Sequence, residues 1–321
     1  METIQGGPIV GVSPRVSLVN GMKLTWSLGK TNSIWRAFRP DVLFMTGGYV
    51  NAPVALTAWL RRTPAAIFLP DVEPGSAIRF LSRFAQKVAC TTPASQAYFR
   101  SGKTVVTGYP VRPQLREALA LSRTEALGHF ELEAGRRTLL VFGGSRGARS
   151  INRALLAVLP QLLESYQVLH ISGALDWPEV EAAAQNVRDE QRRYYRPYAY
   201  LHERMGAALR AADLVVARAG ASMLGESPAF ALPAILVPYP HAWRYQKVNA
   251  DYLAERGAAV RVDDELLPDR LLPVVRELLQ DEARLTQMAA AAGALDRPQA
   301  ASNLARLLQK LAQRHMGNNA W

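Results

Sequence analysis

Short runs of apolar residues recur along the chain, and most of them end at glycine or proline. In the first third these runs cover residues 41–46, 65–69 and 104–107. Four more follow, at residues 138–142, 167–171, 214–217 and 234–237. Helix-length segments separate the runs, and continuous apolar strands that alternate with helices are typical of parallel sheets covered on both faces. The pattern predicts an α/β protein with two parallel sheets.

The segment between the two sets of strands, residues 113–137, is charged and helical and carries little strand signal. With 321 residues, the chain is long enough to form two hydrophobic cores. We therefore expect a first domain over residues 1–115 and a second over residues 116–321. Leucines repeat at helical spacing within residues 300–313, which predicts a final helix that returns toward the first domain.

Charge separates the two predicted domains. Residues 1–115 hold 13 Lys and Arg against 4 Asp and Glu, whereas the remaining residues hold 25 against 23. A basic domain attracts polyanions, such as nucleic acid, an anionic membrane surface or a phosphate-bearing substrate. No zinc finger, RNA-binding sheet motif or Lys/Arg-rich arm is present, which argues against nucleic acid. A generally basic, solvated surface is the alternative explanation.

Two further features limit the class of protein. No apolar run reaches the roughly 18 residues that cross a bilayer, and the first residues lack the pattern of a secretory signal. Cys90 is the single cysteine, so an internal disulfide is excluded and a reducing cytoplasm is expected.

A glycine-rich loop follows the apolar run at residues 138–142 and precedes a helical pattern from about Ser150 to Leu163. Its candidate residues are Gly143, Gly144, Ser145 and Gly147. Glycines let a phosphate approach the backbone, and a helix N-terminus offers free N–H groups and the positive end of a dipole. The loop indicates a phosphate site, although a tight strand-to-helix turn also uses glycines.

A second loop joins a strand to a helix through Arg218, Gly220 and Ser222, with Glu226 early in the helix. A carboxylate at this place can accept hydrogen bonds from two ribose hydroxyls, as in dinucleotide-binding folds. The alternative is a glutamate that only favours a helix N-terminus. A third loop over residues 241–250 combines imidazole, amide and basic groups that suit a sugar.

Six segments, in this order and spacing from about residue 30 to residue 290, resemble one bacterial enzyme family. They are residues 46–53, 74–75, 108–112, 143–148, 218–226 and 246–250. The family, in glycosyltransferase family 28, adds N-acetylglucosamine from UDP-N-acetylglucosamine to undecaprenyl-diphospho-muramoyl-pentapeptide, so it converts lipid I to lipid II in peptidoglycan synthesis. The resemblance implies an inverting UDP-GlcNAc-dependent hexosyltransferase that serves cell wall biogenesis, cell shape and cell division.

The resemblance also implies a GT-B fold, in which two Rossmann-like domains face a cleft. The second domain would bind the donor and the first the lipid-linked diphosphate acceptor. In the donor site, the glycine loop would hold the phosphates, backbone near His202 would contact uracil, and Glu226 would hold the ribose. Arg218, Gly220 and Ser222 would lie beside the nucleotide, and Gln246 and Asn249 would contact the sugar.

The acceptor and its phosphates are expected at one further set of residues. These are Gly47, Gly48, Tyr49, Asn51 and Arg112. No catalytic base is assigned, and Asp71 and His241 are the candidates. No cofactor or metal is expected, because no Asp-x-Asp motif is present and helix N-termini and arginine can stabilise the departing diphosphate. Asp71 with Glu73 is the nearest alternative pair of metal ligands.

Apolar side chains among cations indicate shallow attachment to an anionic membrane. The candidate patch contains Lys23, Leu24, Trp26, Leu28 and Trp59. Each cation near such a surface contributes about 1 kcal/mol, and the segment aligns with the membrane-facing patch of the family. We expect a peripheral protein on the cytoplasmic face of the inner membrane. A helix of the protein core is the alternative.

The chain departs from the family in several places. The family's early Gly-Gly-Thr-Gly-Gly-His loop is not found before Ile9, so we expect the first domain to lack a strand–loop–helix unit. A misassigned start, a partner that supplies the unit, or a non-catalytic UDP-sugar-binding subunit would each account for this. The family's His-Glu-Gln-Asn is Phe68–Asp71, and Tyr109, Met223 and Tyr245 replace other usual residues. These changes concern the acceptor more than the donor nucleotide.

Overall fold

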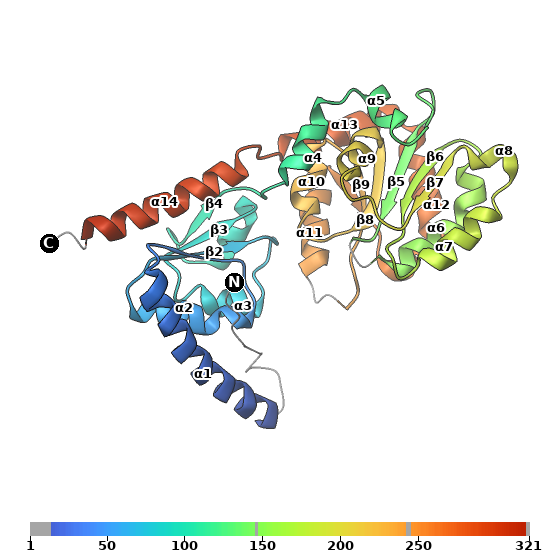
Figure 1. Cartoon of the computed structure of the whole chain (residues 1–321). Helices are drawn as coiled ribbons and strands as arrows, with labels where there is room; N and C mark the ends of the chain where they lie inside the picture. The colour runs from blue at the N-terminus through green and yellow to red at the C-terminus, as the bar shows by residue number, and fades with distance from the viewer. Residues whose placement is uncertain (1–13, 145–146, 242–244, 319–321) are drawn as a thin grey trace. The chain divides into compact units, whose positions relative to one another are not determined.

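The computed structural model describes residues 14–144, 147–241 and 245–318, with the backbone alone for residues 14–25 and 316–318. The chain divides into two compact units (Figure 1). The first contains the chain up to Tyr109 together with the residues from Gln299 onward, and the second is Pro110–Pro298. Each unit contains one parallel sheet, so the predicted α/β class with two parallel sheets is confirmed.

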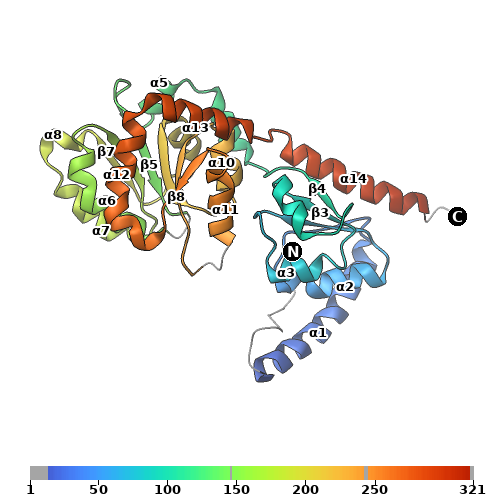
Figure 2. The ribbon, with the colours of Figure 1, turned by 180° about the vertical axis from the view of Figure 1, so that it is seen from behind.

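The first unit is built on a four-stranded parallel sheet in the order β1-β2-β3-β4. Its strands are β1 (Leu43–Met45), β2 (Ala65–Leu69), β3 (Lys87–Cys90) and β4 (Thr104–Val106). Its helices are α1 (Pro14–Phe38), α2 (Ala52–Leu60), α3 (Ser76–Leu81) and α14 (Ala300–Asn318). Every crossover steps to the next strand in one direction, and right-handed crossovers then place α2 and α3 on one face. The two ribbon views show α14 on the other face (Figures 1 and 2).

The core of the first unit lies between β2, β3 and the helices. Ile67, Leu69 and Val88 are fully buried, and the thiol of Cys90 lies among them. Burial raises the pKa of Cys90 to about 12, so this thiol is a neutral core group.

The second unit contains a six-stranded parallel sheet in the order β10-β9-β8-β5-β6-β7. The strands are β5 (Thr138–Phe142), β6 (Gln167–Ile171), β7 (Tyr195–Tyr198), β8 (Leu214–Arg218), β9 (Ala234–Val237) and β10 (Ala259–Arg261). The helices before β8 are α4 (Pro113–Glu117), α5 (Arg123–Gly128), α6 (Arg149–Leu162), α7 (Trp177–Gln185), α8 (Asp189–Arg192) and α9 (Met205–Ala211). Those after β8 are α10 (Met223–Ala229), α11 (Tyr245–Ala254), α12 (Leu267–Gln280) and α13 (Glu282–Ala294).

The strand order of the second unit creates a switch point. The chain moves outward from β5 to β6 and β7, and then crosses back to place β8 on the opposite side of β5. The loops after β5 and β8 therefore start side by side and lead to opposite sides of the sheet. Ligands of open α/β sheets bind at such a point. Helix α6 covers one face because Ile151, Leu155 and Leu162 recur at helical spacing and are fully buried.

Three strands were not predicted. Strand β3 begins with Lys87, β7 contains Arg196 and Pro197, and β10 is three residues long. Proline is tolerated in β7 because that strand is at the sheet edge. The sequence of β7 is typical of a loop, whereas β3 and β10 are too short and too close to charged residues to stand out as apolar runs. Pairing with neighbouring strands makes all three segments strands.

The predicted boundary at residue 115 is also displaced. The chain passes from the first unit to the second between Tyr109 and Pro110, because α4 packs against α9 and so belongs to the second unit. The buried Leu115 lies against Gly206 in this contact. Arg112, which was predicted in the first domain, consequently belongs to the second unit.

Candidate active site

The two loops predicted to bind the donor lie at the switch point of the second sheet. Gly143 and Gly144 follow the carboxyl end of β5, and Arg218 ends the adjacent strand β8 just before Gly220. Because β5 and β8 are neighbours, the glycine loop and the arginine loop emerge side by side.

The backbone of the glycine loop requires glycine for two separate reasons. Gly144 and Gly147 have φ of +90° and +78°, values that residues with a side chain rarely adopt. A Cβ on Gly147 would lie closer than 3.0 Å to the carbonyl oxygen of Ser172, and one on Gly143 would overlap the backbone of Ala148. A Cβ on Gly144 would meet no atom of the described residues within 4 Å, its two chain neighbours aside. The loop is therefore packed on one side and open on the other. Ser145 lies outside the described residues.

A buried hydrogen-bond network fixes the start of α6 behind this loop. The Asn152 amide donates to the Ser172 carbonyl and to the Asp176 carboxylate, both at 2.9 Å. The Arg149 guanidinium donates to the other oxygen of Asp176 at 2.9 Å. The helix start and the end of β6 are thus joined by side chains that the sequence did not single out.

His170 on β6 completes this network. Burial lowers the pKa of His170 to about 3, so its ring is neutral near pH 7. Its Nε2 donates to the Asn152 amide oxygen at 3.0 Å, and its Nδ1 accepts from the Tyr195 hydroxyl at 2.8 Å. These neighbours of His170 are not apparent in the sequence, because its partners on α6 and β7 are 18 and 25 residues away.

Arg218 is held by groups from three other elements. Its guanidinium pairs with the Asp264 carboxylate and donates to the Ser150 hydroxyl at 2.7 Å. The Tyr239 ring lies 5.2 Å from the guanidinium carbon. Ser150 is in the first turn of α6, and Asp264 begins a 3-10 helix after β10. Arg218 therefore links the glycine loop to the far strands, and its charge is paired.

Glu226 lies in α10, and only 9% of its surface is exposed. Burial raises the pKa of this carboxyl, while the charge of Arg112 and a hydrogen bond with the Ser222 side chain oppose the shift. Ser222 and Arg112 therefore lie close enough to Glu226 to stabilise its ionised form. The proximity of Arg112 to Glu226 was not predicted, and the contact between Arg112 and the acceptor phosphates stays a prediction.

The described side chains of the third loop, residues 241–250, make different kinds of contact. The Gln246 side-chain oxygen accepts from the Tyr239 N–H at 2.9 Å. The Asn249 amide donates to the Ala219 carbonyl at 3.1 Å and is 1% exposed, so it supports the arginine loop from behind. The predicted contact between Asn249 and the donor sugar stays a prediction. His241 is exposed and packs on Tyr239 at 5.4 Å.

His202 follows the end of β7, where an exposed ring contacts Tyr200 at 4.7 Å. The predicted uracil contact involves backbone near this residue. His202 lies at the carboxyl edge of the sheet, the same edge as the glycine loop.

In the first unit, the predicted acceptor residues gather after β1. Gly47 and Gly48 have φ of +103° and +83°, and the Asn51 amide donates back to the Gly47 carbonyl. The Tyr49 hydroxyl donates to Ser76 at 2.9 Å, which ties this loop to the start of α3. Asp71 follows β2 and belongs to the same carboxyl edge of the sheet.

Glu73 belongs to the alternative pair of metal ligands, together with Asp71. Glu73 is buried and pairs with Arg79 at 2.9 Å. Among the residues that the structure describes, no group of three His, Cys, Asp or Glu side chains is placed to hold a metal ion. No described helix is long and apolar enough to span a membrane.

Comparison with protein families identifies both halves of the chain. Residues 1–90 match the model of the glycosyltransferase family 28 N-terminal domain, and residues 138–305 match that of the C-terminal domain. The chain belongs to glycosyltransferase family 28. The glycine loop, the arginine loop and Glu226 all lie in the match to the family 28 C-terminal domain.

Family 28 relatives are similar over nearly the whole chain. A protein of Roseiflexus sp. (strain RS-1) is 39% identical, with 98% of this chain and 79% of the relative covered. A protein of Moorella thermoacetica is 41% identical over 89% of this chain and 78% of its own length. Both are named UDP-N-acetylglucosamine--N-acetylmuramyl-(pentapeptide) pyrophosphoryl-undecaprenol N-acetylglucosamine transferase.

Solved structures agree with this membership. MurG of Acinetobacter baumannii is 25% identical, with a TM-score of 0.72 over 91% of this chain and 79% of its own. The UDP-GlcNAc 2-epimerase from Neisseria meningitidis, solved with UDP-GlcNAc, has a TM-score of 0.63 at 13% identity, over 94% of this chain and 84% of its own. The second likeness concerns the fold alone.

Proposed function

We propose that this chain is an inverting glycosyltransferase that moves N-acetylglucosamine from UDP-N-acetylglucosamine to undecaprenyl-diphosphate-linked muramoyl-pentapeptide. The observation that carries the proposal is the 39% identity, over 98% of the chain, to a relative named for this transfer. The geometry supports it, because a glycine loop and a buried carboxylate follow the two strands that form the switch point.

The donor would occupy the carboxyl edge of the second sheet. The open side of the glycine loop, at Gly144, leaves room for phosphate oxygens beside the N-terminus of α6. Since Arg218 is paired with Asp264, the diphosphate would be stabilised mainly by backbone N–H groups and the helix dipole. Glu226 would accept hydrogen bonds from the ribose, and Gln246 and His241 lie on the loop proposed for the sugar.

The reaction is a displacement at the anomeric carbon. The acceptor hydroxyl forms the new C–O bond, the bond to the UDP diphosphate breaks, and UDP leaves with the electron pair. A base must take the hydroxyl proton. Asp71 and His241 stay the candidates for that base, and neither metal nor cofactor is part of the proposal.

The test is turnover by the purified full chain with UDP-N-acetylglucosamine and a lipid-linked muramoyl-pentapeptide acceptor. UDP release and the mass of the lipid product are measured together. Glu226→Ala should raise KM for the donor at least about tenfold, because hydrogen bonds to a carboxylate are lost. Glu164→Ala, at an exposed position beyond α6, is the matched control.

Turnover and UDP affinity test different parts of the proposal. Donor binding without turnover would support a UDP-sugar-binding subunit instead of an enzyme. Unchanged UDP affinity in Glu226→Ala would show that the ribose site is wrongly placed.

We also propose peripheral attachment to the cytoplasmic face of an anionic membrane through the first unit. Trp26 on α1 and Trp59 on α2 are 61% and 57% exposed, which is unusual for such large apolar side chains. Trp59 contacts Phe84 at 6.2 Å, and the Lys30 ammonium lies 5.9 Å from the Trp26 ring. The predicted patch residue Leu28 is half-buried. The side chains of Lys23 and Leu24 lie outside the described residues.

Vesicles that contain phosphatidylglycerol test this attachment by co-sedimentation with the full chain. Trp59→Ala and Trp26→Ala should each reduce the bound fraction, because the aromatic ring no longer inserts at the interface. Leu175→Ala removes an apolar side chain of similar exposure from the second unit and should change nothing. Equal loss in all three variants would contradict the assignment.

A further inference from the structure

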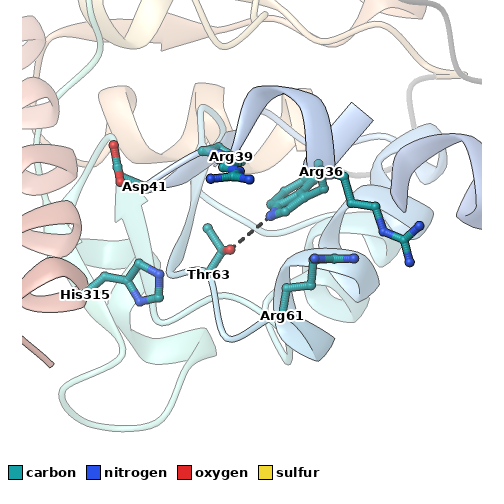
Figure 3. A pocket seen from close by; sticks show the side chains of 8 residues that line it. Arg36, Arg39, Asp41, Arg61, Thr63 and His315 are labelled. Carbon is teal, nitrogen blue, oxygen red and sulfur yellow. Dashed lines mark hydrogen bonds between the residues drawn. The ribbon is translucent and has the colours of Figure 1, made fainter. Parts of the chain in front are cut away.

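A pocket of about 740 Å³ lies in the first unit, away from the proposed substrate edge (Figure 3). Its lining includes Arg36, Arg39, Asp41, Arg61, Thr63 and His315. Residues 35–41 lead into the amino end of β1, and Arg61 and Thr63 precede the amino end of β2. Gly47 and Asp71 follow the carboxyl ends of the same strands. Five residues of β2 span roughly 15 Å, so the pocket and the acceptor loops are at opposite edges of the sheet.

Among the described residues that line this pocket, arginines outnumber carboxylates. Three guanidinium groups face one carboxylate in the lining, at Asp41. Within the described part of the chain, the side chains of Arg36 and Arg39 form no ion pair. Arg61 donates to the Asn32 amide oxygen from Nε at 2.9 Å and from Nη2 at 2.6 Å. A neutral amide orients this guanidinium but leaves its charge available.

The pocket is also built from fixed parts. Trp35 is buried, and its indole N–H donates to the Thr63 hydroxyl at 3.0 Å, which joins the end of α1 to the segment before β2. Arg39 has φ of +47°, a left-handed conformation that is unfavourable for a residue with a Cβ. Its N–H donates to the Trp35 carbonyl at 2.9 Å, so this left-handed residue ends α1 in a way that is common at helix C-termini and orients the chain toward β1. Figure 3 shows Arg39 between Arg36 and Arg61 on one side and Asp41 and His315 on the other.

We propose that this pocket binds a phosphate-bearing anion that is not a substrate of the transfer reaction. Guanidinium groups match phosphate oxygens in charge and in the geometry of their paired N–H donors. The His315 imidazole, from the end of α14, also lines the pocket. The phosphate could belong to a lipid headgroup or to a small molecule in solution, and the experiment separates these two sources.

The experiment measures two probes on the full chain in the presence of saturating UDP, so that the donor loop is occupied. Inorganic pyrophosphate is titrated by calorimetry, and vesicles with and without phosphatidylglycerol are compared by co-sedimentation. The variants are Arg39→Gly, Arg36→Gln and Arg61→Gln. Glycine at position 39 removes the guanidinium and suits the left-handed backbone, so this variant keeps the fold. Arg100→Gln, at an exposed loop of the same unit, is the control.

Each pocket variant should lower the affinity for the probe that binds, pyrophosphate or the anionic vesicles, by about tenfold, because one charge-assisted contact to phosphate is lost. A loss for pyrophosphate would identify a soluble ligand, and a loss confined to phosphatidylglycerol vesicles would identify a headgroup. If neither probe responds more to the pocket variants than to Arg100→Gln, the proposal is wrong. It is also wrong if Arg39→Gly raises KM for the acceptor as strongly as it weakens the probe, because the pocket would then be part of the substrate site.

Discussion

Substituting alanine for Gly147 should destabilise the second unit far more than the same change at Gly144. Both glycines have positive φ and belong to the same loop, so both variants carry conformational strain. They differ in surroundings, because a Cβ on Gly147 overlaps the Ser172 carbonyl and one on Gly144 meets no described atom within 4 Å, chain neighbours aside. Comparing Gly144→Ala with Gly147→Ala therefore separates the stability lost to backbone strain from the stability lost to overpacking.

The structure sets the expected magnitudes. A left-handed residue with a Cβ costs about 1–2 kcal/mol, and replacing glycine returns about 0.4–1 kcal/mol through the unfolded chain. Gly144→Ala should therefore lower the free energy of unfolding by about 1 kcal/mol. Overpacking adds about 1–3 kcal/mol at Gly147, since the overlapping atom is backbone at the end of a buried strand. The total for Gly147→Ala is about 2–4 kcal/mol.

Urea unfolding of the full chain measures the free energies, and calorimetry measures UDP affinity. Gly144→Ala should keep most of the stability but lose UDP affinity, because its methyl group projects into the space proposed for phosphate. Gly143→Ala adds overlap with Ala148 at a φ that is not positive, so it should fall between the two. Equal destabilisation by Gly144→Ala and Gly147→Ala would refute the packing argument.

Two other predictions concern pH. Because burial raises the pKa of Glu226, the free energy of unfolding should decrease as pH rises and this carboxyl ionises in the folded state. Glu226→Gln should remove this decrease. The same variant should weaken UDP binding about tenfold. Unfolding curves at pH 5 and pH 8 check it, and parallel behaviour of both proteins would contradict it. The pKa of His170 falls to about 3, so stability should drop as pH decreases from about 6.5 toward 3, where only the unfolded chain takes the proton. His170→Gln should flatten that decline while His129→Gln, at an exposed position, should not.

The strands that could be predicted are those whose local sequence already reflects their burial. Strand β2 was predicted with its observed bounds, because each of its five residues is apolar and buried. Strand β7 was not, because Arg196 and Pro197 are typical of a loop and become a strand only beside β6. Tertiary pairing, which a local pattern does not contain, decides such segments.

The same limit applies to the site. The glycine loop and Glu226 were predicted because their chemistry depends on near neighbours and on the strand-to-helix connection. Asp264 was not, since its partners Arg218 and Ser150 are 46 and 114 residues away. The proximity of Arg112 to Glu226 and the hydrogen bond from Asn249 to the Ala219 carbonyl were not predicted either, because these partners lie on other elements of the chain.

Charge pairing distinguishes the two units more clearly than net charge does. In the second unit, arginines near the strand ends are matched by carboxylates, as in Arg218 with Asp264 and Arg149 with Asp176. A nucleotide held there would depend on backbone N–H groups and close packing, which salt screens weakly. In the first unit, Arg36 and Arg39 face solvent in an open pocket, where salt screens strongly. UDP affinity measured by calorimetry should therefore change little between low and high salt, whereas anion binding to the first unit should fall steeply. A steep fall for both would mean that unpaired charge, and not the glycine loop, holds the nucleotide.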